Sequence, residues 1–256
     1  TGWGEQPVLV YGSAYCPGDY IQLTTEPAEG FYEIRLEDSM PPAIVYLTEG
    51  VLRYDIPFDE QRIPYSPKSF SGNLHMITAR PAATDCIYGR RNLALNPYDQ
   101  ATMTGVFPHA SANIETRGEA VFAARNAIDG NYANSFHGEY PYTSWGINRN
   151  PDAAFRIDLG VPSLVDEVCL TLRADFPHDN YWTEATIEFS DGSSETMGMS
   201  KKPLPQQLRL PANQVHRAEL RKLIQSNAPS PSYYQPLTPP PKHLVTLTTR
   251  NESHTQ

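Results

Sequence analysis

Short segments that alternate apolar and polar residues, separated by turn residues, limit what this chain can fold into. Five of them lie in the first third, at residues 8–11, 20–23, 31–36, 44–47 and 51–56. Turn signals such as Pro17-Gly18 and Glu49-Gly50 stand between them. Alternation of period two over a few residues indicates strands, and the spacing is typical of a small sandwich. We therefore expect residues 1–90 to form a small accessory β-sandwich domain.

Composition supports an all-β fold. The 256 residues include 24 Pro, 16 Gly and 15 Tyr, a balance that suits many short strands and turns better than long helices. A chain of this length more often forms two domains than one. The periodicity is lost between about residues 84 and 107, so we place the domain boundary near residue 90.

The second half of the chain also has strand signals. Residues 154–159 alternate, residues 160–162 (Gly-Val-Pro) break the pattern, and residues 168–173 resume it. Residues 186–190 run into Asp191-Gly192, a strong hairpin signal because glycine tolerates positive φ. A short helical or turn-like patch is expected at residues 118–128. We expect a second sandwich over residues 91–228.

The C-terminal segment, residues 229–256, is rich in proline and reads as an extended tail. Within it, residues 243–249 recover a strand pattern. They either pair with an edge of the sandwich or are disordered, and we favour partial disorder.

Charge and hydropathy exclude some partners. Lys and Arg total 20 against 29 Asp and Glu, and the net charge of −9 repels a phosphate backbone, so we expect no nucleic-acid partner. No apolar run approaches the roughly 18 residues of a spanning helix, so we expect no membrane insertion. The three cysteines show no metal-binding spacing. We expect a secreted or cell-surface protein, with a cytoplasmic location as the alternative.

Residues 173–182 combine a guanidinium, two carboxylates, an imidazole, an amide and two amphipathic rings directly after a strand. A neutral sugar needs hydrogen-bond donors and acceptors for its hydroxyls and a ring face for its C–H side, and this loop supplies all of them. A second loop, residues 137–146, has a similar composition. We expect the two loops to bind a carbohydrate, and the candidate residues are His137, Tyr140, Trp145, Arg173, Asp175, His178, Asn180 and Trp182.

Each of these residues also has a structural interpretation. Arg173 and Asp175 can form an ion pair with each other at the strand end. Trp145 and Trp182 can be core residues beneath long loops. His178, next to Pro177, can cap a turn.

Residues 92 to about 226 resemble the galactose-binding-like superfamily, which includes discoidin or coagulation-factor type C domains, fucolectins and family 32 carbohydrate-binding modules. Four segments carry the resemblance in the expected order: residues 92–94 (NLA), 126–131 (NAIDGN), 155–160 (FRIDLG) and 173–175 (RAD). The last resembles the Arg-x-Asp pair of fucolectins. Their third basic residue falls here on Asn180, a departure from the fucolectin pattern.

The resemblance implies an eight-stranded jelly-roll with ligand loops at one end and non-catalytic carbohydrate binding. It also implies a structural Ca²⁺ held at the Asp-Gly turn by carboxylate and main-chain oxygens, and hard oxygen ligands clustered within ten residues suit that ion. The matching residues are Asn126, Asp129, Asn131 and Ser135. A capped turn without metal is the alternative.

An enzyme acting on acidic polysaccharide is the alternative function. A polysaccharide lyase would need a base and groups that neutralise a uronate, and the candidate residues include both. A glycoside hydrolase would need two facing carboxylates, for which Asp175 and Glu139 are the pair to nominate. Neither arrangement has a recognisable motif here, and no hydrolase, phosphate-loop or dinucleotide motif occurs.

Overall fold

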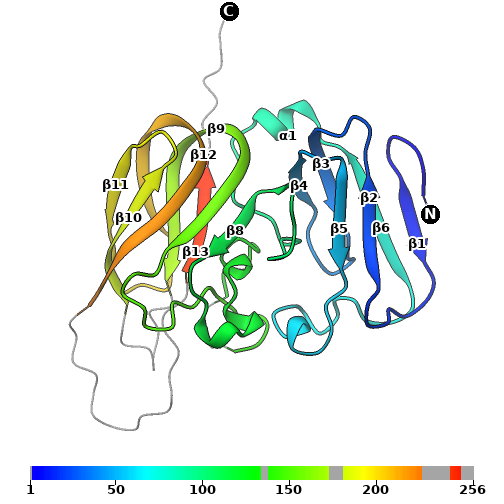
Figure 1. The fold of residues 1–256 in the computed structure, drawn as a ribbon, viewed down its shortest axis with the longest axis horizontal. Coiled ribbons are helices and arrows are strands. Elements are labelled where there is room, and N and C mark those ends of the chain that lie inside the picture. Colours follow the sequence, from blue (N-terminus) through cyan, green and yellow to red (C-terminus); the bar gives the residue numbers. More distant parts are fainter. Residues whose placement is uncertain (1, 134–137, 173–180, 227–242, 249–256) are drawn as a thin grey trace, which may run out of the picture.

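The computed structural model describes residues 2–133, 138–172, 181–226 and 243–248. Two groups of strands lie side by side along the long axis (Figure 1). Strands dominate the described residues, as the composition predicts. The helical elements are short: α1 (Thr84–Tyr88) and the 3-10 turns η1 (Asp59–Arg62), η2 (Thr116–Gly118), η3 (Ala120–Phe122) and η4 (Ala124–Ala127).

The first unit holds a five-stranded sheet and a two-stranded one. The larger has the order β1-β6-β3-β4-β7, formed by β1 (Val8–Tyr11), β6 (His75–Pro81), β3 (Gly30–Arg35), β4 (Ala43–Leu47) and β7 (Val106–Phe107). The smaller pairs β2 (Tyr20–Thr24) with β5 (Val51–Asp55). All five strands expected from the alternating segments are present, and β6 is an addition. Inward residues such as Ile34, Val45 and Tyr54 are fully buried in one core cluster.

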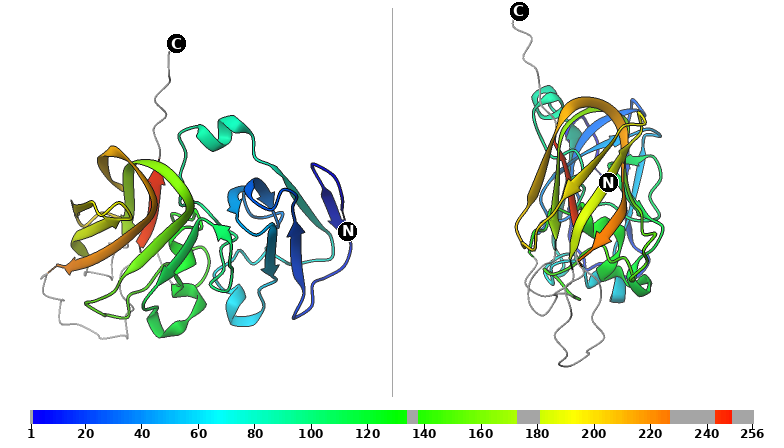
Figure 2. Two further views of the ribbon diagram at one scale, coloured as in Figure 1. Left: turned by 45° about the horizontal axis from the view of Figure 1, so that its top comes forward. Right: turned by 90° about the vertical axis from the view of Figure 1, so that its left-hand side faces the viewer.

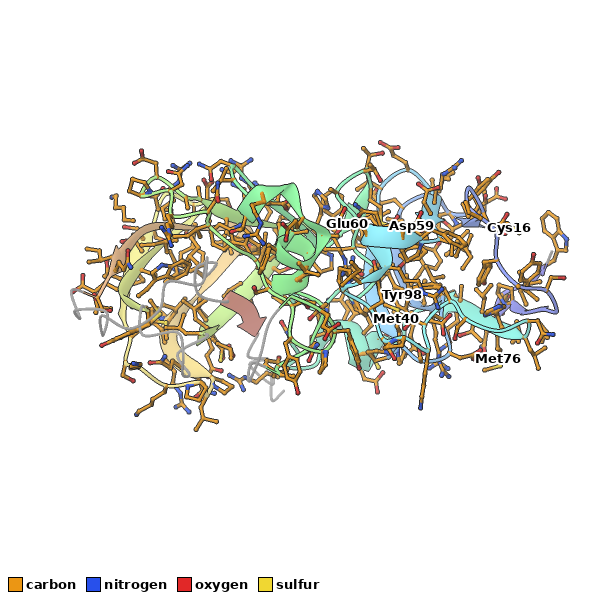
Figure 3. The ribbon with its side chains drawn as sticks, turned by 90° about the horizontal axis from the view of Figure 1, so that it is seen from below. Cys16, Met40, Asp59, Glu60, Met76 and Tyr98 are labelled. Carbon is orange, nitrogen blue, oxygen red and sulfur yellow. The ribbon has the colours of Figure 1, made fainter. Side chains whose placement is uncertain are left out.

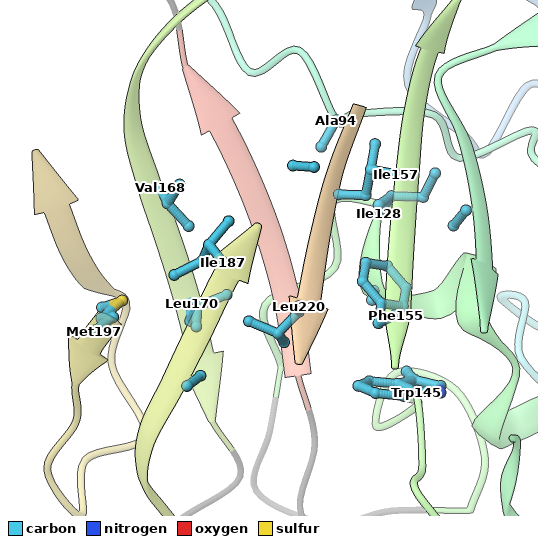
Figure 4. Close-up of a cluster of buried hydrophobic side chains, with 14 of the residues drawn as sticks. Ala94, Ile128, Trp145, Phe155, Ile157, Val168, Leu170, Ile187, Met197 and Leu220 are labelled. Atoms are coloured by element: carbon cyan, nitrogen blue, oxygen red, sulfur yellow. The ribbon is translucent and has the colours of Figure 1, made fainter. Parts of the chain in front are cut away.

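The second unit is one curled sheet with the order β11-β10-β12-β9-β13, and β8 also pairs with β9. Its strands are β8 (His109–Ala112), β9 (Phe155–Leu172), β10 (Trp182–Phe189), β11 (Ser194–Gly198), β12 (Gln206–Gln225) and β13 (His243–Thr248). The end-on view in Figure 2 shows how the long strands wrap around this body. Figure 4 shows the side chains that fill it, among them Trp145, Phe155 and Leu220.

The ladder shared by the long strands β9 and β12 is irregular at two places. The register shifts between Arg209 and Asn213 and again between Val215 and Arg217. The described residues of this unit form six strands, and the eight strands that the resemblance implies stay a prediction. The expected break at residues 160–162 is therefore a bend within β9 rather than an interruption of the strand.

Gly160 is required at that bend. Its φ is +74°, a conformation that disfavours residues with a Cβ, and a Cβ there would lie 2.5 Å from Cδ2 of Phe107. The expected hairpin at Asp191-Gly192 is also present, with Gly192 at φ +87° between β10 and β11.

The C-terminal strand adds to the second unit. Residues 243–248 pair antiparallel with residues 167–172 of β9. Of the two alternatives for this segment, the structure shows edge pairing, and the partial disorder that we favoured is wrong for residues 243–248.

The segment between the units belongs to both cores. Leu93 and Ala94 pack in the second core, whereas Tyr98 and Met103 pack in the first. The strands β7 and β8, which follow, pair with β4 and β9 respectively. The expected connector is therefore a buried, shared segment, and the division into domains near residue 90 stays a prediction.

Candidate functional site

The loop of residues 138–146 places two aromatic side chains in opposite environments. Tyr140, near its start, is 40% exposed, whereas Trp145, near its end, is fully buried. Backbone hydrogen bonds hold the loop in a tight shape, with the N–H of Gly138 donating to the carbonyl of Tyr142 at 3.2 Å. Tyr140 is therefore an accessible ring on a fixed backbone, as a sugar-stacking residue requires.

Trp145 and Trp182, two of the expected stacking residues, are part of the core. They are 0% and 1% exposed, and their ring centroids lie 6.0 Å apart in an edge-to-face arrangement. The Trp145 Nε1–H donates to the carbonyl of Ile114 at 2.9 Å, and its ring packs on Phe155. Neither indole has a face open to a sugar, so the structural interpretation holds for both tryptophans and their predicted stacking role is wrong.

The remaining predicted contact residues fall outside the described part of the chain. His137, Arg173, Asp175, His178 and Asn180 belong to this group, as does the calcium candidate Ser135. Their roles stay predictions from the sequence.

The predicted calcium turn is closed by its own hydrogen bonds. The Asn126 carboxamide donates to the carbonyl of Ala120 at 2.8 Å, and its oxygen accepts from the Arg125 guanidinium at 2.9 Å. An Asp129 carboxylate oxygen accepts from the N–H of Asn131 at 2.7 Å.

A guanidinium bonded to the Asn126 oxygen would repel a cation held by the same atom. Among the described residues, no group of three or more His, Cys, Asp or Glu side chains could hold a metal ion. The side chain of Asn126 therefore does not fit a calcium ligand in this conformation. Calcium binding at the turn stays a prediction for the other residues.

The first unit anchors the Tyr140 loop. The N–H of Tyr140 donates to the carbonyl of Ile63 at 3.1 Å. Close by, Oε1 of Glu60 accepts from the N–H of Ala120 at 2.7 Å, which joins η1 of the first unit to η3 of the second. Figure 3 shows Asp59 and Glu60 beside the helical turns of the second unit. The two units therefore meet at the backbone of Tyr140 and at η3.

A buried polar cluster fixes the same junction from inside. The fully buried Asp99 accepts from His109 Nδ1 at 2.7 Å and from the N–H of Ala110 at 2.9 Å. The Arg125 guanidinium donates to the carbonyls of Asp99 and Pro97, both at 2.7 Å, and lies over the Tyr65 ring with its carbon 4.5 Å from the centroid. These contacts satisfy the buried charges, as burial requires.

Electrostatics couple Asp99 and His109. The hydrogen bond to the carboxylate raises the pKa of His109 above its usual value, although burial acts in the opposite direction. Burial raises the pKa of Asp99, and its hydrogen bonds offset part of that rise. The pair is structural: it joins the segment before β8 to the first residues of that strand.

A second polar cluster, in the first unit, was not indicated by any sequence motif. Three buried atoms there have no hydrogen-bond partner within the described residues: Glu37 Oε2, His75 Nε2 and Tyr15 Oη. The Tyr15 and His75 rings lie 4.2 Å apart, and burial together with Glu37 raises the pKa of Tyr15 to about 12. Its members are dispersed along the chain, so only the fold brings them together.

Sequence reasoning also missed the exposed side chains around Tyr140. Ile63 is 42% exposed and Tyr132 is 46% exposed. The Asn131 carboxamide donates to the carbonyl of Pro141, which ties the segment before Tyr132 to the Tyr140 loop. Alternating patterns predict strands but not which turns meet, and no local signal could have identified these neighbours.

A scan of protein-family models gave no match, and a search of curated proteins found no similar one. Among the described residues, no helix is long and apolar enough to cross a membrane.

Solved structures similar to part of the chain include the family 32 carbohydrate-binding module of C. perfringens NanJ in complex with galactose. That match has 17% identity and a TM-score of 0.38, and covers 54% of this chain and 91% of the module. The lectin-binding domain of a lectinolysin mutant complexed with Lewis b matches with 15% identity and a TM-score of 0.40, and the match covers 63% of this chain and 97% of that domain. A fucose-binding module of Streptococcus pneumoniae matches with 12% identity and a TM-score of 0.38, and the match covers 63% of this chain and 99% of that module. Each of these likenesses covers between 54% and 63% of this chain.

Proposed function

We propose that the second unit, residues 91–228, binds carbohydrate without catalysis, through loops at one end of its sandwich. The observation that carries this proposal is the order of four motif segments between residues 92 and 175, each at the place where galactose-binding-like modules have its counterpart. The first unit is then an accessory domain, and the protein acts in a secreted or cell-surface location.

Each proposed contact residue has a chemical role. The Arg173 guanidinium donates parallel hydrogen bonds to vicinal hydroxyls, and Tyr140 offers the ring on which a pyranose stacks. The polar side chains of the two loops complete the hydrogen bonding: His137, Asp175, His178 and Asn180. The exposure of Tyr140 supports this assignment, whereas the buried Trp145 and Trp182 support the loops from the core.

Affinity at such a shallow surface comes from a few hydrogen bonds offset by the loss of bound water. Single sites of this kind bind weakly, and repeated ligands or neighbouring modules supply avidity. Multivalent display is therefore the appropriate assay format.

A glycan array probed with the full chain, with and without a chelator, tests the proposal. Retention on defined glycans is expected, and galactose-, fucose- and Lewis b-terminated glycans are the first probes because the similar modules are named with those ligands. Loss of retention with chelator would add calcium to the proposal. A blank array would overturn it.

Incubation of the protein with a panel of polysaccharides that includes acidic ones separates binding from turnover. Unsaturated uronate absorbance or new reducing ends after incubation would favour the alternative, a lyase or hydrolase acting on acidic polysaccharide. Retention without products is the expected outcome.

Arg173→Ala is the sharpest single variant. If the guanidinium faces ligand, its removal should cost roughly 1.5 to 3 kcal/mol of binding free energy, as for other charged hydrogen bonds. Arg209→Ala is the matched control, because its side chain is 88% exposed on β12 and lies in neither loop. Equal affinity of both variants and the parent would remove Arg173 from the site.

A further inference from the structure

The proposed binding surface adjoins the first unit. We name four residues at this boundary the junction rim: Gln61 and Ile63 from the first unit, and Tyr132 and Tyr140 from the second. All four are exposed. The N–H of Tyr140 donates directly to the carbonyl of Ile63, so these two residues lie next to each other although they belong to different units.

The contact is built rather than incidental. Glu60 uses a carboxylate oxygen to accept from Ala120 at 2.7 Å, and Arg125 lies over Tyr65 while donating to the carbonyl of Asp99. The charge-assisted bond and the cation–π contact hold residues 60–65 of the first unit against residues 120–125 of the second. A ligand therefore meets both units in one fixed arrangement, without an ordering cost at this boundary.

The chemistry of the rim fits a sugar chain. Tyrosine rings and the Ile63 side chain supply apolar surface for C–H faces. The Gln61 Nε2 donates to Glu60 Oε2 at 3.4 Å, and its carboxamide oxygen and second N–H can accept from and donate to hydroxyls. A single pyranose stacked on Tyr140 occupies only the second unit's part of this surface. The next residue of an oligosaccharide has the η1 turn to contact.

We propose that the η1 turn of the first unit is part of the carbohydrate-binding surface, with Gln61 and Ile63 recognising the residue that follows the sugar stacked on Tyr140. The first unit thereby selects oligosaccharides over monosaccharides. This inference rests on the proposed function of the second unit.

Paired ligands test the inference with the full chain. Calorimetric titrations compare galactose with lactose and fucose with fucosyllactose, and each glycan retained on the array with its terminal monosaccharide. The test variant is the double substitution Gln61→Ala with Ile63→Ala. Because both residues are exposed, we expect stability to be nearly unchanged. Leu74→Ala is the matched control, an apolar residue of the first unit that is 68% exposed outside the rim.

The double variant should weaken oligosaccharide binding by about three- to tenfold and leave monosaccharide binding unchanged, as expected from the loss of a hydrogen bond and an apolar contact. The Leu74 variant should match the parent. In methyl-labelled protein, the δ1 signal of Ile63 should shift with the oligosaccharide but not with the monosaccharide.

Equal binding of the double variant and the parent, or an equal loss for both ligand lengths, would overturn the inference. The outcomes distinguish this failure from failure of the proposed function. If Tyr140→Ala weakens binding while the double variant does not, the second unit binds sugar without the first. If the parent binds no glycan at all, both proposals fail.

Discussion

The two ends of the loop of residues 138–146 place aromatic side chains in opposite environments. At the Trp145 end, the aromatic ring is sealed against Phe155 and Trp182, and its only polar group is satisfied by a backbone carbonyl. At the Tyr140 end, the ring is 40% exposed and its backbone is held by the first unit. Trp145 anchors the loop in the core, whereas the Tyr140 ring stays exposed to solvent. Aromatic content alone therefore does not locate a binding face.

The same contrast separates the buried junction from the junction rim. In the buried junction, the polar groups form hydrogen bonds with one another and with the backbone; they belong to Asp99, His109 and Arg125. Gln61, Ile63 and Tyr140 leave their side chains exposed only a short distance away. If this division is right, substitutions in the buried group should reduce stability, and substitutions in the rim should reduce binding.

The largest effect is expected at the core end of the loop. Trp145→Ala removes a fully buried ring from the second core, and such truncations cost about 3–5 kcal/mol of unfolding free energy. Urea denaturation measures the change. Trp3→Ala is the control, because Trp3 is 87% exposed and its loss should change stability by less than about 0.5 kcal/mol. If the Trp145 variant kept the stability of the parent but lost glycan retention, Trp145 would have a binding role and not a structural one.

The next effect is expected in the buried junction. Asp99→Ala leaves the His109 ring and the N–H of Ala110 without their acceptor, which should cost about 2–3 kcal/mol. Asp55→Ala, at a carboxylate that is 52% exposed, is the matched control and should have little effect. Differential scanning calorimetry measures both. Similar melting temperatures for the two variants would mean that the buried contacts do not hold the junction.

A smaller effect, on binding alone, is expected at the rim end. Tyr140→Ala should weaken glycan binding by about 0.5–1.5 kcal/mol, the usual contribution of an aromatic contact, with stability nearly unchanged. Tyr140→Phe should retain most of the affinity because the ring remains. Tyr88→Ala, at a tyrosine that is 65% exposed on α1, controls for the loss of a surface ring. Unaltered binding by Tyr140→Ala would remove this ring from the site.

The smallest effect is expected from pH. The pKa of His109 is raised in the folded state by Asp99, so its contribution to stability is complete below the unfolded value of about 6.5. The contribution is lost as pH rises through the higher folded value. Asp158, opposite His109 on β9, raises the pKa of His109 as well, and Arg125 stands beside Asp99.

Unfolding free energies measured from pH 6 to 9 should therefore fall as pH rises, and His109→Gln should flatten that slope. If the unfolding free energy of His109→Gln depended on pH in the same way as that of the parent, a group other than His109 would cause the dependence.

Much of the fold could be predicted from local pattern. Five of the seven strands of the first unit and the hairpin at Asp191-Gly192 follow from period-two alternation and turn chemistry, which act over a few residues. The strand β12 was missed because Pro211 and many polar residues interrupt its alternation, and its pairing with β9 and β10 compensates for them only in the folded sheet. The site was harder to predict, since Trp145 and Tyr140 lie five positions apart in equally polar surroundings.

By itself, the sequence determined the all-β class, five strands of the first unit, the hairpin at Asp191-Gly192 and the segments that resemble galactose-binding-like modules. Only the tertiary structure decided that Trp145 is core and Tyr140 is surface, that residues 93–112 serve both units, and that Ile63 lies beside Tyr140. The physical reason is the distance along the chain over which each interaction acts. Alternation and turn preferences are set by neighbours along the chain, whereas burial depends on which distant surfaces the sheets bring together.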